Sequence, residues 1–178
     1  PIFNPIGFGA WASGADWGEV SERDAEAALN AARDAGVNFI DTADVYGMGR
    51  SEKIIAEVLK SRRGKKDVIV ATKAGRKLTP HIAPGYTVQA ITGFIDQSLK
   101  NLQVEALDVL QLHCPPTPVY HDTKLFTGLD QLVKAGKLKY YGVSVQTVEE
   151  AITAMDYPIA SIQIIFNMFR QKPIEKLF

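Results

Sequence analysis

Short apolar runs and amphipathic stretches alternate along the chain. The apolar runs, at residues 6–11, 37–41, 68–72, 107–112, 138–143 and 162–166, have the length of strands. Amphipathic segments begin after Ser21, Thr87 and Thr147 and span residues 51–59 and 124–135, with the apolar spacing typical of helices. This alternation predicts β-then-α units whose strands are parallel and joined by right-handed crossovers.

Two architectures are built from such units: an open doubly wound sheet and a barrel. No shift in composition marks a second domain, so residues 1–178 are interpreted as a single domain. The chain is 46% hydrophobic and 22% charged, which is enough apolar material for a buried core and enough charge for a polar surface.

The overall charge and the cysteine content narrow the functional classes. Lys plus Arg and Asp plus Glu are 20 each, which argues against binding nucleic acid through a generally basic surface. A dense basic run at residues 60–66 is interpreted as cations at a helix C-terminus. The lone cysteine, Cys114, suits the reducing cytoplasm. No apolar run has the roughly 18–20 residues needed to cross a membrane, so we expect neither a membrane nor a nucleic-acid partner.

Polar residues stand where several predicted strands end. Asp41 ends the second strand with Tyr46 in the loop after it, Lys73 ends the third strand, and His113 ends the fourth. Each residue has an ordinary interpretation when taken alone: a helix cap, a packed ring, a solvated lysine or a hydrogen-bonded spacer. Because strand ends converge in a barrel, the four together predict one catalytic cavity.

These four groups suit proton transfer to a carbonyl oxygen. An Asp41–Lys73 ion pair would hold a positive charge near the Tyr46 hydroxyl, favour the phenolate and lower its pKa from roughly 10. Tyr46 can then act as a general acid in carbonyl reduction and as a base in the reverse direction. His113 can hydrogen-bond the same oxygen. No metal is needed, and the histidines and Cys114 lack metal-ligand spacing.

Three rival signals are weaker. Gly7 and Gly9 have no third glycine in place for a dinucleotide-binding fingerprint. Tyr120 and Lys124 have the spacing of a short-chain dehydrogenase pair, but Tyr120 lies in a Pro-rich loop rather than on a helix preceded by a serine. Residues 142–146 lack the last glycine of a nucleophile elbow.

Four segments resemble the signatures of the aldo-keto reductase family, in the family's order. They are residues 41–47 (DTADVYG), 71–73 (ATK), 110–113 (LQLH) and 142–144 (GVS). Residues 7–11 resemble the family's first strand and the loop that follows, and residues 49–52 resemble the helix start after the catalytic tyrosine. The resemblance covers nearly all 178 residues.

The resemblance implies a (β/α)8 TIM barrel, of which this chain covers about the first six of eight β/α units. It implies hydride transfer between NADP(H) and an aldehyde, ketone or alcohol. NAD(H) stays open as the cofactor, because the family's adenosine-phosphate site follows the eighth strand. In this scheme Tyr46 is the proton donor, Lys73 tunes it, Asp41 holds Lys73, and His113 orients the carbonyl.

The resemblance also implies cofactor and substrate contacts. The implied cofactor-binding residues are Gly9, Ala10, Trp11, Asp41, Ser144 and Gln163, and the implied substrate pocket is formed by Trp11, Tyr46 and His113. Ser144 and Gln163 match positions that hydrogen-bond the nicotinamide carboxamide. The chain departs from many family members at Val145, where they have asparagine, so the contact of that side chain is not implied here.

A closed barrel typically takes about 250 residues, and six strands leave two sheet edges unpaired. We therefore predict that the chain is part of a longer protein, with a second copy covering the edges as the alternative. Residues 1–178 alone should expose apolar surface, bind cofactor poorly and tend to aggregate. The alternatives to a catalytic oxidoreductase are a non-catalytic regulator that binds the cofactor and an inactive fragment. The intact set of Asp41, Tyr46, Lys73 and His113 favours catalysis.

Overall fold

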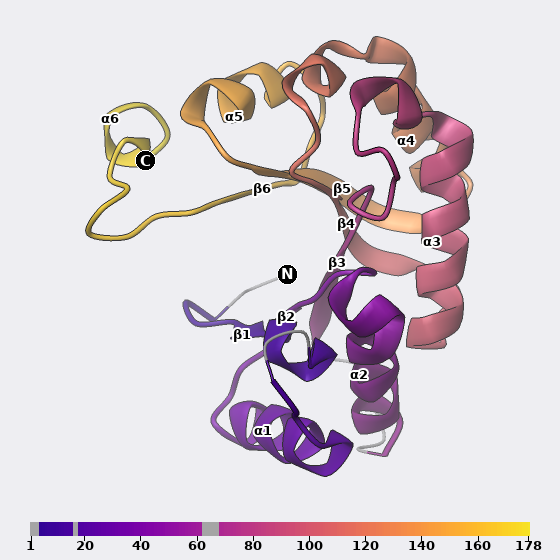
Figure 1. Cartoon of the computed structure of the whole chain (residues 1–178), viewed down its shortest axis with the longest axis vertical. Coiled ribbons are helices and arrows are strands. Elements are labelled where there is room, and N and C mark those ends of the chain that lie inside the picture. Colours follow the sequence, from indigo (N-terminus) through magenta and orange to yellow (C-terminus); the bar gives the residue numbers. More distant parts are fainter. Residues whose placement is uncertain (1–3, 16–17, 62–67) are drawn as a thin grey trace.

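The computed structural model describes residues 4–15, 18–61 and 68–178, and its frame is one six-stranded parallel sheet in the order β1-β2-β3-β4-β5-β6. The strands are β1 (Phe8–Gly9), β2 (Phe39–Asp41), β3 (Ile69–Ala74), β4 (Leu107–His113), β5 (Leu138–Val145) and β6 (Ser161–Ile164). The sheet curls into an arc, and the helices that connect consecutive strands lie along its outer side (Figure 1). An open half-barrel results, which decides between the two architectures that the sequence left open.

The helices are α1 (Glu22–Asp34), α2 (Arg50–Ser61), α3 (Val88–Leu102), α4 (Thr123–Lys134), α5 (Val148–Ala154) and α6 (Pro173–Lys176). The predicted N-caps Ser21, Thr87 and Thr147 each accept a hydrogen bond from the backbone of the following turn. Thr147 and Glu150 form a complete capping box, whereas the Asp24 carboxylate accepts a hydrogen bond from the Ser21 hydroxyl instead of the Ser21 backbone.

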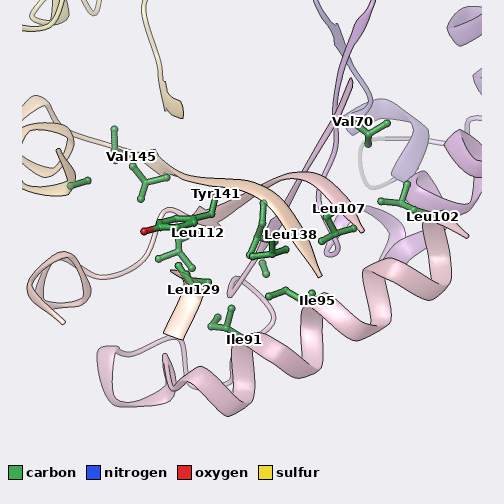
Figure 2. Packing of buried hydrophobic residues seen from close by; sticks show 14 of the residues in the cluster. Val70, Ile91, Ile95, Leu102, Leu107, Leu112, Leu129, Leu138, Tyr141 and Val145 are labelled. Atoms are coloured by element: carbon green, nitrogen blue, oxygen red, sulfur yellow. The ribbon is translucent and has the colours of Figure 1, made fainter. Parts of the chain in front are cut away.

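The core lies between the strands and the surrounding helices (Figure 2). Ile91 and Ile95 of α3 are fully buried, and they belong to the same apolar cluster as Leu107, Leu112 and Leu138 on the strands. Burying a side chain of this size contributes about 1.5–3 kcal/mol. This packing fixes the strands, and through them the positions of the residues at the strand ends.

Two predicted strands end earlier than expected. β1 ends at Gly9, because the chain turns at Ala10 into a 3-10 helix over Trp11–Gly14. β6 ends at Ile164, which is the last residue paired with β5 in the sheet. The basic run at residues 60–66 lies largely outside the described residues.

β1 and β6 are the two edges of the sheet, each paired on one side only. The inner face of the sheet borders a cavity of about 450 Å³, lined in part by Gly7, Phe39, Val109 and Tyr140. Beyond β6, Phe169 is 89% exposed. Within the described ranges, no helix combines the length and the apolar character that a membrane crossing needs.

Candidate active site

The predicted catalytic residues meet at the carboxyl ends of the strands. Asp41 is the last residue of β2, Lys73 lies one residue before the end of β3, and His113 ends β4. Tyr46 begins a 3-10 helix, Tyr46–Gly49, in the loop after β2. Tyr46, Lys73 and His113 line one cavity of about 970 Å³, and Asp41 contacts Lys73 beside it.

Lys73 is held in place by Asp41. The Lys73 Nζ atom lies 2.7 Å from both carboxylate oxygens of Asp41 and 3.0 Å from the Thr42 carbonyl oxygen. Lys73 is 1% exposed, and this burial lowers its pKa, while the charge of Asp41 and its hydrogen bond act in the opposite direction. Lys73 Nζ lies 5.4 Å from the centre of the Tyr46 ring, so the ammonium is directed at the phenol.

His113 faces Tyr46 from the neighbouring side of the cavity. The two ring centres are 6.0 Å apart, with an angle of 87° between the planes. Burial, followed by the charges of Lys73, Arg76 and His81, lowers the pKa of His113 to about 3. The imidazole is therefore neutral near pH 7. Its buried Nδ1 atom has no hydrogen-bond partner among the described residues. A neutral imidazole can donate one hydrogen bond to a substrate oxygen.

The start of α2 positions the loop that carries Trp11. The Arg50 guanidinium donates to the Ser13 carbonyl oxygen at 2.6 Å, and the Ser51 hydroxyl donates to the Ala10 carbonyl oxygen at 3.0 Å. These bonds join the segment after β1 to the helix that follows the Tyr46 loop. The Trp11 and Tyr46 ring centres are consequently 6.4 Å apart at the cavity wall.

Gly47 allows the same two loops to approach closely. Its φ is +56°, and a Cβ atom at this position would lie 2.4 Å from the carbonyl oxygen of Gly14. A larger residue would force the loops apart and displace the adjacent Tyr46. The close approach of the two loops therefore explains why a glycine stands at this position of the DTADVYG segment.

Asp44 is a buried acid that the sequence did not single out. It is 1% exposed, and both of its carboxylate oxygens lack hydrogen bonds within the described residues. The Lys77 Nζ atom lies 4.0 Å from Asp44 Oδ2. Burial outweighs the attraction of Lys77 and raises the pKa of Asp44 from 3.8 to about 7.

Some of the predicted cofactor-binding residues line the cavity, and others do not. Ser144 and Gln163 are paired neighbours on β5 and β6, and both line the cavity, as does Trp11. A hydroxyl and an amide side by side match the donors and acceptors of a carboxamide, so they fit a nicotinamide group. Gly9 and Ala10 do not line this cavity, and Ala10 is 1% exposed.

A model of the family described as "Aldo/keto reductase family" matches residues 5–178. The chain belongs to the aldo/keto reductase family. It is 32% identical to aldo-keto reductase YhdN of Bacillus subtilis, over 97% of this chain and 53% of that protein. It is also 32% identical to aldo-keto reductase yakc [NADP(+)] of Schizosaccharomyces pombe, over 92% of this chain and 49% of that protein.

The fold agrees with solved structures of the family. The holo form of aldo-keto reductase AKR11C1 from Bacillus halodurans superposes with a TM-score of 0.83 at 25% identity, covering 97% of this chain and 57% of that one. The half-barrel therefore corresponds to part of a (β/α)8 aldo-keto reductase barrel. The chain spans about half the length of the curated relatives named above.

The cavity of this aldo/keto reductase is also lined by residues that the sequence analysis had not assigned, notably Arg76 and Arg170. They lie in loops after strands, where a single sequence gives little positional information. The rival tyrosine, Tyr120, is fully buried and donates to the Ser144 carbonyl oxygen at 3.3 Å, so it is a packing residue. Over the described ranges, no group of three or more His, Cys, Asp or Glu side chains is arranged to hold a metal ion.

Proposed function

We propose that this protein transfers a hydride between NADP(H) and an aldehyde or ketone, with Tyr46 as the general acid. The observation that carries the proposal is the convergence of the Asp41-paired Lys73, Tyr46 and His113 on one cavity. The S. pombe relative, which has NADP(+) in its name, supports the choice of cofactor. NAD(H) is the alternative. A cytoplasmic location is part of the proposal.

In this scheme each side chain has one task. The bound cofactor supplies the hydride. The Lys73 ammonium stabilises the phenolate that Tyr46 becomes when it donates its proton to the carbonyl oxygen. The neutral His113 donates a hydrogen bond to the same oxygen and orients it. Ser144 and Gln163 would hold the carboxamide of the bound cofactor and so orient the cofactor in the cavity.

The proposal is tested by NADPH consumption with a panel of small aldehydes. The complete gene product and its Tyr46→Phe variant are compared, with Tyr140→Phe as the matched control, because Tyr140 is half-exposed on β5 and lies outside the catalytic cavity. Losing the general acid should lower kcat/KM by about 10²- to 10⁴-fold. The control should retain the parent rate.

Equal rates for the parent and Tyr46→Phe would refute the assignment of the proton donor. Tight NADPH binding without turnover of any aldehyde would instead support the non-catalytic regulator that the sequence left as an alternative. Neither binding nor turnover would support the inactive fragment.

A further inference from the structure

The catalytic cavity is lined by three cations, Lys73, Arg76 and Arg170, and by no aspartate or glutamate among the described residues. Lys73 is paired with Asp41. Neither guanidinium forms a hydrogen bond or an ion pair within the part of the chain that the structure describes. Positive charge that faces a cavity without a neutralising partner attracts anionic ligands into it.

Arg76 differs in this respect from the lysine beside it. Lys77 is largely buried, with its ammonium 4.0 Å from the Asp44 carboxylate. Arg76 is exposed at the cavity, and no carboxylate in the described residues forms an ion pair with it. In this loop, Lys77 therefore lies beside Asp44 of the same protein, whereas Arg76 is available to a ligand in the cavity.

Arg76 and Arg170 occupy different sides of the cavity. Arg76 lies two residues beyond β3, and its charge is one of the causes that lower the pKa of His113 at the end of β4. Arg170 lies beyond β6, on the side of the proposed carboxamide contact Gln163. Arg76 is thus on the side where Tyr46 and His113 would hold the substrate carbonyl.

We propose that Arg76 binds a carboxylate or phosphate carried by the carbonyl substrate and so selects anionic aldehydes or ketones. The inference rests on the proposed function, because it assigns the side of the cavity near Tyr46 to the substrate. A guanidinium presents paired N–H donors that match both anions, whereas an ammonium offers only a point charge.

The test measures kcat/KM of the NADPH-loaded complete gene product on three related aldehydes. They are para-carboxybenzaldehyde, para-formylphenyl phosphate and the uncharged methyl ester of para-carboxybenzaldehyde. The variants are Arg76→Ala, Arg76→Lys and the remote control Arg23→Ala, whose exposed side chain lies on α1. Arg76→Ala should lower kcat/KM about 10- to 100-fold on an anionic aldehyde and leave the ester within about twofold. Arg76→Lys should recover part of the loss.

The larger loss, on carboxylate or on phosphate, identifies which anion the site prefers. An equal loss on the ester, no loss on either anionic aldehyde, or weakened NADPH binding in Arg76→Ala would overturn the inference. If the protein turns over none of the aldehydes, the proposed function fails separately. Calorimetric titration with terephthalate then decides on Arg76: weaker binding by Arg76→Ala supports the anion site, and binding that is unchanged or absent in both proteins refutes it.

Discussion

Burial lowers the pKa of Lys73, whereas the charge and the hydrogen bond of Asp41 raise it. Asp41→Asn removes the main interaction that raises the pKa of Lys73, so this pKa should fall further. Lys73 then loses its proton at a lower pH, and the alkaline limb of the kcat/KM profile should move to lower pH. Asp41→Glu should restore part of the shift. A profile that keeps the parent's shape at a lower amplitude would contradict this role for Asp41.

Asp44 should make stability depend on pH in the opposite sense to most acids. Its folded-state pKa is raised from 3.8 to about 7, so between these values the folded state binds the extra proton and stability falls as pH rises. Asp44→Asn should therefore stabilise the protein by about 2–4 kcal/mol above pH 7 and change little near pH 4.

Thermal melts at both pH values measure this effect, with Asp156→Asn as the control on an exposed carboxylate. If Asp44→Asn stabilised the protein equally at acidic and at neutral pH, the raised pKa of Asp44 in the folded state would be contradicted.

At the residue scale, the sequence was informative where chemistry coincides with a strand end. Asp41, Lys73 and His113 could be predicted to converge because parallel strands bring their carboxyl ends together. Asp44 could not, since its raised pKa depends on burial that only the packed structure reveals. Arg76 could not either, because its proposed role depends on the lack of an acidic side chain among the described residues that line the cavity in three dimensions.

At the element scale, the contact between β5 and β6 controls the proposed carboxamide site. A Cβ atom on Gly142 would lie 2.2 Å from the carbonyl oxygen of Ser161, its partner in β6. Gly142→Ala should push β6 away, destabilise the fold by about 1–3 kcal/mol and weaken NADPH binding, because Gln163 moves relative to Ser144.

The matched control is Gly93→Ala in the middle of α3, where an added Cβ meets no atom within 4 Å. This change should stabilise the protein by about 0.5–1 kcal/mol. Chemical denaturation and NADPH titration of both variants measure the contrast. Unchanged NADPH affinity in Gly142→Ala would show that the register of the two strands does not set the cofactor site.

Some boundaries of helices and strands can be predicted from the sequence, and others cannot. The caps at Ser21, Thr87 and Thr147 were predictable because an N-cap depends on a side chain and the next turn of backbone. The ends of β1 at Gly9 and of β6 at Ile164 were not, because they depend on which neighbouring segment pairs or bonds with them.

At the scale of the whole molecule, the unpaired edges of β1 and β6 and the exposed apolar side chains beyond β6 should govern solution behaviour. A polypeptide limited to residues 1–178 should self-associate, because Met168 and Phe169 are 74% and 89% exposed and two sheet edges are open. Light scattering during a concentration series measures this. A stable monomer with a cooperative unfolding transition would contradict the prediction.

The cooperation of Tyr46 and Lys73 is tested most directly by a double-mutant cycle on kcat/KM. The four proteins are the parent, Tyr46→Phe, Lys73→Met and the double variant, assayed with NADPH and one aldehyde. If Lys73 acts only through the Tyr46 phenol, the double variant should be no slower than Tyr46→Phe alone. Losses that multiply in the double variant would show that the ammonium and the phenol serve the reaction independently, contrary to the proposed mechanism.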